Sequence, residues 1–345
     1  MASQPETERG FWAALERPVL AMAPMANVTD AVFRQMFVEA GGSAGRPSVF
    51  WTEFVSVEGL LSRGRERLLT DLWFGADEHP IVAQIFGSKP EQFEEVAPMI
   101  RDLGFDGIDI NMGCPDRGIE KSGAGAALIK DPARAQEIIR AVKRGLRKGA
   151  GTDGGAGRML PVSVKTRIGY AKNELSMWAP ALFGEGLAAL TMHFRTRNEM
   201  SDVPARWDLA PELAAMRNEI APETLVLGNG DVASPAEARA RARAGSIDGV
   251  MIGRGLFGNP WFFSGRSPDL PEKLRRMVRH AELFEERYRS GSAGGRLKEF
   301  DIMKKHFKAY CSGFDRAKEL RIKLMAAENA AEVRSITESF LAAGF

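Results

Sequence analysis

Short apolar runs alternate with helical patterns along most of the chain. The first run spans Pro18–Met25, and apolar residues then recur at helical spacing from Thr29 to Phe37. Short apolar runs predict buried parallel strands, and the helical spacing predicts amphipathic helices. The same unit recurs, with further strands predicted at Ser48–Glu53, Pro80–Phe86, Gly107–Asn111, Val162–Thr166, Leu187–His193, Thr224–Asn229 and Gly249–Gly253.

Helices are predicted between most of these strands. Those with the clearest spacing are Val55–Leu69, Glu91–Leu103 and Pro132–Leu146. Prolines at first-turn positions follow plausible caps in three places, as Ser88 with Pro90, Asp131 with Pro132, and Ser234 with Pro235. Eight strand-helix units in about 240 residues favour an α/β fold with a closed (β/α)8 TIM barrel over an open doubly wound sheet.

The pattern changes after Pro271, where only helices are predicted. They are Pro271–Tyr288, Lys298–Cys311, Arg316–Ala327 and Ala331–Ala342, with a Gly/Ser break from Ser290 to Gly295. We therefore expect a catalytic barrel over residues 1–265 and a helical domain over residues 266–345. The glycine-rich segment Lys148–Arg158 precedes a strand, so we expect a flexible insertion without chemistry on the face away from the site.

Composition narrows the class of protein. With 345 residues and 44% hydrophobic content, the chain can bury a sizeable core. It has no apolar run long enough for a membrane span and no signal-peptide pattern, so a cytoplasmic protein is expected. Two cysteines and four scattered histidines exclude a disulfide framework and argue against a metal site. The oligomeric state stays open, with a monomer as the expectation.

Charge is unevenly distributed along the chain. Residues 266–345 carry 17 Lys and Arg against 12 Asp and Glu, whereas the rest carries 30 against 33. A basic helical tail is most often a solvated surface, but it is also typical of an accessory nucleic-acid contact.

One cysteine stands at the tip of a predicted strand. The segment Phe105–Asp116 begins as a strand and breaks at Gly113 and Pro115, which hold the backbone on either side of Cys114. Asn111 precedes the thiol by three residues, and a glycine-rich loop, Lys121–Ala126, follows. A small buried hydrophobic residue is the alternative reading. The context favours a thiol in a site where a planar ligand approaches the backbone.

Polar residues gather at the predicted carboxyl ends of the strands, where a barrel of this type places its active site. Gly230, Gly253 and Gly255, with Arg254, resemble a phosphate cradle. Gln84 suits the edge of a heterocycle, and Lys165 and His193 suit a reduced flavin. This combination suggests FMN, because no dinucleotide fingerprint of the kind that FAD or NAD would require is found.

These motifs resemble the tRNA-dihydrouridine synthases. They span residues 18 to 264 in order, and Asn111–Pro115 is the most specific of them. The motifs that carry the resemblance are Ala23-Pro24-Met25, Asn111-Met112-Gly113-Cys114-Pro115, Val164-Lys165-Thr166-Arg167, His193 with Arg195-Thr196-Arg197, Gly228-Asn229-Gly230-Asp231 and Ile252-Gly253-Arg254-Gly255.

The resemblance implies an enzyme that reduces uridine in tRNA to 5,6-dihydrouridine, with FMN as cofactor and NADPH as the usual reductant. Hydride would pass from flavin N5 to C6, and Cys114 would give the proton to C5. Asn111, Arg167, Arg195 and Arg197 would contact the RNA. The cofactor contacts implied are Ala23, Pro24, Met25, Gln84, Lys165, His193, Asn229, Gly230, Asp231, Gly253 and Arg254.

The sequence departs from the family pattern after the sixth strand, at Phe194, Ser201, Val203 and Arg206. These departures concern the way in which RNA is held and the uridine position that is modified. Two alternatives stay open. One is an FMN barrel acting on a small molecule, of the dihydroorotate dehydrogenase type, and the other is an RNA-binding relative without catalysis.

Overall fold

The computed structural model describes residues 9–42, 45–148, 159–289 and 297–344. The chain forms two compact units, one of Met1–Met25 with Pro47–Gly253 and the other of Ala26–Arg46 with Arg254–Phe345. Residues 26–46 thus group with the helical part of the chain. That residues 1–265 and 266–345 are separate domains stays a prediction. Most of the predicted insertion, residues 149–158, lies outside the described residues.

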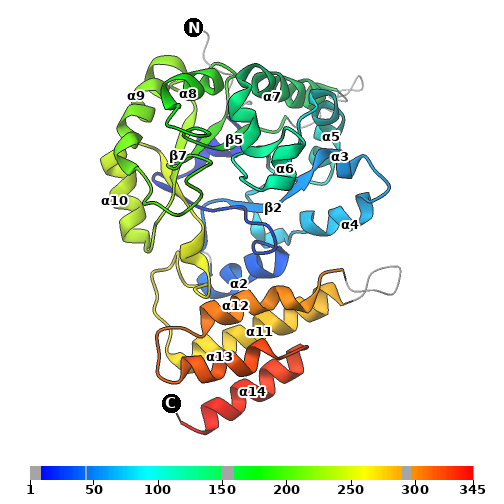
Figure 1. Ribbon diagram of the computed structural model, residues 1–345, viewed down its shortest axis with the longest axis vertical. Helices are drawn as coiled ribbons and strands as arrows, with labels where there is room; N and C mark the ends of the chain where they lie inside the picture. Colours follow the sequence, from blue (N-terminus) through cyan, green and yellow to red (C-terminus); the bar gives the residue numbers. More distant parts are fainter. Residues whose placement is uncertain (1–8, 43–44, 149–158, 290–296, 345) are drawn as a thin grey trace. The chain divides into compact units, whose positions relative to one another are not determined.

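The first unit is built on eight parallel strands, as predicted (Figure 1). Strands β2 to β8 each pair with their neighbours in sequence, and β1 pairs with β8. Ala21 in β1 bridges to Val49, just before β2, which closes the sheet into a (β/α)8 TIM barrel. The strands are β1 Val19–Met22, β2 Phe50–Ser56, β3 Ile81–Phe86, β4 Gly107–Met112, β5 Val162–Arg167, β6 Ala189–His193, β7 Leu225–Asn229 and β8 Gly249–Ile252.

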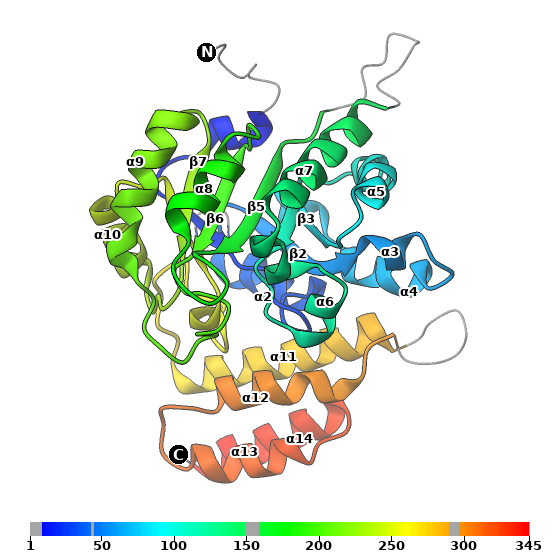
Figure 2. The same cartoon turned by 45° about the horizontal axis from the view of Figure 1, so that its top comes forward.

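Helices surround the barrel on its outer side (Figure 2). The longer ones are α5 Pro90–Asp102, α7 Pro132–Arg147, α8 Leu175–Phe183, α9 Ala210–Ile220 and α10 Pro235–Gly245. Asp131 and Ser234 cap α7 and α10 as predicted, each accepting a backbone N–H bond. The predicted cap Ser88 is wrong, because α5 begins after Lys89 without a side-chain cap.

The single helix predicted at Val55–Leu69 is also wrong. Strand β2 continues to Ser56, since Val55 and Ser56 pair with β3, and two short helices follow, α3 Val57–Leu60 and α4 Arg65–Leu69. The β-branched Val55 favours the strand, and the Ser56 side chain accepts the N–H of Gly59 and so starts α3. A third short helix, α6 Arg117–Lys121, follows β4.

Packing closes the end of the barrel where the strands begin. The 3-10 turn Gly10–Ala14 places Trp12 in a core with Val19, Leu225 and Trp51, and Trp12 is only 1% exposed. The indole rings of Trp12 and Trp51 lie 5.8 Å apart. Because this end is filled by apolar side chains, the opposite end of the barrel is left for polar chemistry.

The second unit is entirely helical within the described residues. It contains α2 Ala31–Gly41, α11 Leu270–Tyr288, α12 Met303–Tyr310, α13 Ala317–Met325 and α14 Ala330–Ala342. Helix α11 packs against α2, α12 and α14. Among the described residues, no helix is both long and apolar enough to cross a bilayer.

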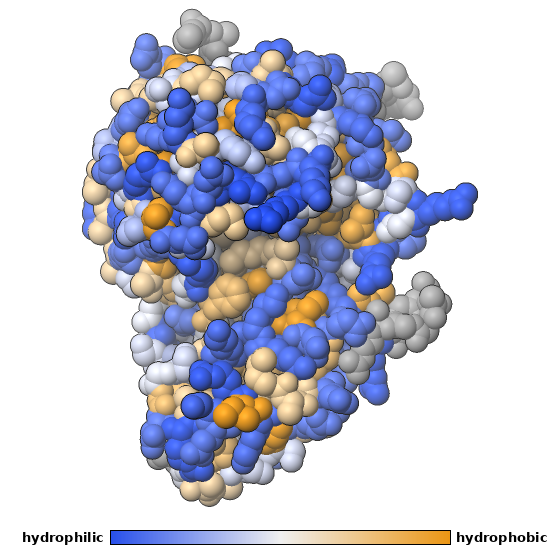
Figure 3. All heavy atoms as spheres, viewed as in Figure 1, coloured by the Kyte–Doolittle hydropathy of each residue, from blue (hydrophilic) through white to orange (hydrophobic). Residues whose placement is uncertain are grey.

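The face of the molecule seen in Figure 3 is mainly hydrophilic, and its hydrophobic residues are scattered.

Candidate active site

Strand register brings the predicted polar residues to one end of the barrel. Across neighbouring strands, Gln84 pairs with Asp109, Asn111 with Lys165, Arg167 with His193, and His193 with Asn229. Gln84, Asn111, Lys165, Arg167, His193 and Asn229 lie on strands β3 to β7, in the half of the barrel where the parallel strands end. The barrel therefore assembles one polar site from five consecutive strands.

A buried relay of side-chain hydrogen bonds fixes the turn that carries Cys114. Asn111 Oδ1 accepts the backbone N–H groups of Gly113 at 3.1 Å and Cys114 at 2.9 Å. Its Nδ2 must therefore donate, and it does so to Gln84 Oε1 at 3.0 Å. Gln84 Nε2 in turn donates to Asp109 Oδ2 at 2.7 Å. Because a carboxylate can only accept hydrogen bonds, Asp109 determines which end of the Gln84 amide faces it. Gln84 in turn determines the orientation of the Asn111 amide.

The glycine-rich loop packs directly against the cysteine. Gly125 has φ +61°, and a Cβ there would lie 2.8 Å from the Cys114 carbonyl oxygen. The Ala126 N–H donates to that same oxygen at 3.0 Å. Only glycine fits this left-handed, crowded position. The loop predicted to admit a ligand therefore supports the backbone of Cys114.

The Cys114 thiol is half-buried and stays protonated at neutral pH. Burial raises its pKa above the ordinary value, which outweighs the opposing positive charges of Arg167 and Lys165. Lys165 is itself half-buried, and burial together with Arg167 lowers its pKa to about 8. A protonated thiol beside cationic groups can act as a general acid.

The three arginines predicted to contact RNA make contacts within the protein. Arg167 donates to the carbonyl oxygens of Gly113, Thr196 and Met200 at 2.8, 3.1 and 2.9 Å. Arg195 pairs with Asp231, and Arg197 pairs with Glu120 on α6. Their contact with RNA stays a prediction.

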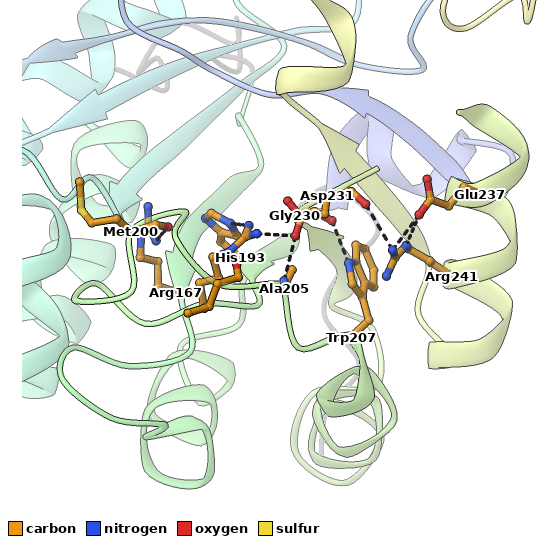
Figure 4. Close-up of polar contacts among 11 residues, drawn as sticks. Arg167, His193, Met200, Ala205, Trp207, Gly230, Asp231, Glu237 and Arg241 are labelled. Carbon is orange, nitrogen blue, oxygen red and sulfur yellow. Dashed lines mark hydrogen bonds and ion pairs between the residues drawn. The ribbon is translucent and has the colours of Figure 1, made fainter. Parts of the chain in front are cut away.

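The loop after β6 is tied to the loop after β7 (Figure 4). The N–H of Ala205 donates to the Asp231 carboxylate at 2.9 Å, and Trp207 Nε1 donates to the Gly230 carbonyl at 2.8 Å. Two departures from the family pattern support this loop. Phe194 is buried against Trp207, with ring centroids 5.0 Å apart, and Arg206 pairs with Glu199.

The ends of β1 and β8 supply the remaining predicted cofactor residues of this unit. Ala23, Pro24 and Met25 follow β1, and a Cβ at Gly253 would lie 3.5 Å from Met25 Sδ. Asn229 Nδ2 donates to the Met251 carbonyl at 2.8 Å, so this amide joins β7 to β8. Arg254 is the first residue of the second unit, and its place in the site stays a prediction.

Sequence reasoning missed Asp109 and Ser163. Ser163 Oγ donates to Asp109 Oδ1 at 2.6 Å, and burial raises the pKa of Asp109 to about 6. The sequence does contain a signal for Asp109, which is an aspartate within an otherwise apolar parallel strand. Such a residue is costly to bury unless it accepts hydrogen bonds, so partners for it could have been expected.

We predict that the hydrogen-bond relay from Asp109 to Cys114 works only when each donor faces an acceptor. Gln84→Glu sets two carboxylates against each other and should change the rate of Cys114 alkylation severalfold in flavin-free protein. The double variant Asp109→Asn/Gln84→Glu reverses donor and acceptor and should restore the rate, since contacting residues couple by about 0.5 to 3 kcal/mol. Alkylation by iodoacetamide measures this, because Cys311 is fully buried. Additive effects of the two changes would contradict the relay.

Fold and site together define a (β/α)8 barrel with a thiol-bearing polar site at the ends of its strands. Comparison with known proteins assigns the family. The sequence model of the dihydrouridine synthase family (Dus) matches residues 21–343, so the chain belongs to that family.

Curated relatives agree over nearly the whole chain. The chain is 40% identical over 337 residues to the "Probable tRNA-dihydrouridine synthase" of Staphylococcus aureus (strain Mu50), covering 96% of each. It is also 40% identical over 334 residues to the "Probable tRNA-dihydrouridine synthase 2" of Bacillus subtilis (strain 168), again covering 96% of each. Among solved structures, the old yellow enzyme from Trypanosoma cruzi aligns with a TM-score of 0.44 at 14% identity, over 74% of this chain and 90% of that one.

Proposed function

We propose that this enzyme reduces uridine in tRNA to 5,6-dihydrouridine, with FMN as its cofactor and NADPH as its reductant. The observation that carries the proposal is the Asn111–Cys114 turn, which holds a protonated, half-buried thiol beside Lys165 and Arg167 at the strand ends. The family and the names of its relatives support the substrate class. A cytoplasmic location is part of the same proposal.

The residues present fit a flavin mononucleotide. At the end of β7, Gly230 has φ +127°, a conformation that favours glycine, so the backbone there can approach a ligand closely. Lys165 offers a cation, and His193 offers a ring nitrogen, on the neighbouring strands. These residues would hold FMN, which when bound supplies the hydride.

The chain's own residues carry the proton and the positioning. Asn111 orients the Cys114 backbone, and the glycine loop supports it from the other side. Cys114 would then give its proton to uracil C5 as hydride reaches C6. A uridine in folded tRNA must be turned outward before its base can reach this thiol.

Purified protein tests the proposal directly. We expect bound yellow flavin that NADPH bleaches, and dihydrouridine formation when the reduced protein meets unmodified tRNA. Flavin that orotate-type small molecules re-oxidise, while tRNA does not, would favour the dihydroorotate dehydrogenase alternative. Absence of flavin chemistry together with tRNA binding would favour the non-catalytic one.

We predict that exposed lysines of the second unit, which we call the helical unit, contact tRNA phosphates. Lys318 and Lys323 lie on the exposed face of α13. Replacing both with glutamine should reduce the slope of log affinity against log salt by about 0.7 to 0.9 for each phosphate that is no longer neutralised. Filter binding to one tRNA between 50 and 200 mM salt measures this slope, and flavin content should not change.

Arg239 and Arg243 provide a matched control. Both are exposed on α10, on the outside of the barrel, and their replacement by glutamine removes the same charge. If both double variants lower the slope equally, the helical unit has no particular role in binding. Point variants are preferable to deletion of residues 266–345, because Phe33, on α2, would lose its contacts with His280 and His306 in the deletion variant.

A further inference from the structure

We propose that Arg195 is a positioning residue that holds His193 as the neutral Nδ1–H tautomer. This inference rests on the proposed function, because His193 is one of the residues assigned to the flavin. It concerns a property of the protein itself, the position of one proton. That property can be measured without cofactor or tRNA.

Each of the three nitrogens of the Arg195 guanidinium has a partner at the junction of two loops. Its side chain is 2% exposed. Nε donates to the Val203 carbonyl at 2.5 Å, one terminal nitrogen donates to the Asp231 carboxylate, and the other lies 3.1 Å from His193 Nε2. The Asp231 carboxylate balances the buried positive charge.

The chemistry of a guanidinium decides which nitrogen of His193 carries the proton. A guanidinium has only N–H donors, so the His193 Nε2 that faces it must accept with its lone pair. The Nε2–H tautomer would set donor against donor. An imidazolium would add a like charge at the same contact. The neutral ring with its proton on Nδ1 is the only form that makes this bond.

The lack of a side chain at Gly230 leaves room for the His193 ring and for the loop after β6. A Cβ at Gly230 would lie 3.3 Å from His193 Cδ2 and 2.6 Å from Ala205 Cβ. Gly230 therefore allows the ring edge and the loop to approach, while the Ala205 N–H holds Asp231 in place (Figure 4). With Nε2 accepting from Arg195, the proton of the neutral His193 ring lies on Nδ1. A neutral ring adds no second full charge beside Lys165.

The imidazole nitrogens can be observed directly. The chain has four histidines, so ¹⁵N-labelled flavin-free protein should give four resolvable imidazole systems, and loss of one in His193→Asn assigns His193. We expect the Nδ1–H pattern for His193 at pH 8. In Arg195→Met we expect a mixture of tautomers or the Nε2–H form, with the other three histidines unchanged as evidence of folding.

Each outcome decides the proposal. An Nε2–H or doubly protonated His193 in the unmodified protein overturns it, and an unchanged Nδ1–H pattern in the Arg195 variant removes Arg195 from the explanation. If Arg195→Met does not fold, Arg195→Gln serves, because its amide can either donate or accept and so does not force His193 Nε2 to accept.

Discussion

Replacing Cys114 with alanine should separate the two halves of the reaction. Flavin binding and bleaching by NADPH need no proton from the thiol, so both should stay near the level of the unmodified protein. Re-oxidation by tRNA needs a proton at uracil C5 and should slow by about 10² to 10⁴-fold, the usual contribution of a general acid. Rapid mixing of one preparation, first with NADPH and then with tRNA, measures both steps.

Cys311 supplies the matched control. It is the only other cysteine, is fully buried, and contacts Met277 Sδ at 3.7 Å in the helical unit. Cys311→Ala removes a thiol of the same size, so it should lower stability modestly and change both half-reactions alike. Near-normal re-oxidation by tRNA in Cys114→Ala would remove Cys114 from the mechanism.

The barrel could be predicted because every strand carries its own local signal. A buried parallel strand is apolar on both faces, and a glycine, proline or polar residue follows it, so eight such segments identify eight strands. The failure at Val55–Leu69 shows the limit of this reasoning. Val55 and Ser56 fit either a helix start or a strand end, and only pairing with Ile85 and Phe86 decides between them.

Site residues could be placed at the strand ends, but their partners could not. Arg167, Arg195 and Arg197 are visible in the sequence as cations near the site. That they bind Gly113, Asp231 and Glu120 depends on contacts across 36 to 77 positions along the chain. Only the folded structure shows that these charges serve to build the site.

The unit division could not be predicted either. Helix α2 follows the first strand, where a barrel would place its first outer helix, yet it packs against α11. The reason lies in its apolar face. Phe33 contacts the rings of His280 and His306, with centroids 6.0 and 5.3 Å apart, and these residues lie more than 240 positions away in sequence. No local pattern carries that information.

The same histidine pair predicts that acid destabilises the helical unit. His280 and His306 are fully buried, with ring centroids 4.7 Å apart, and their four ring nitrogens have no hydrogen-bond partner among the described residues. Burial lowers the pKa of His280 to about 3 and that of His306 well below its ordinary value, and His280 and then Lys305 add to the lowering of the His306 pKa. Both rings are therefore neutral in the folded protein.

Because the folded pKa values lie below the unfolded value of about 6.5, the unfolded state takes up protons first as the pH falls. Stability is thus fully present above pH 6.5 and is lost between there and the folded pKa values. Each histidine should cost about 2 kcal/mol between pH 7 and pH 5, since a proton bound only in the unfolded state changes stability by about 1.4 kcal/mol per pH unit.

Urea unfolding followed by circular dichroism at pH 7 and pH 5 measures this loss. The control is the double variant His280→Leu/His306→Leu, in which every other titrating group is retained. It should lose about 4 kcal/mol less than the unmodified protein over the same interval, because the two histidine contributions are gone. Equal losses of unfolding free energy in the two proteins would contradict the prediction. They would mean that the unfolded chain gains no protons at these rings relative to the folded chain. The rings would then have to be charged or hydrogen-bonded in the folded unit.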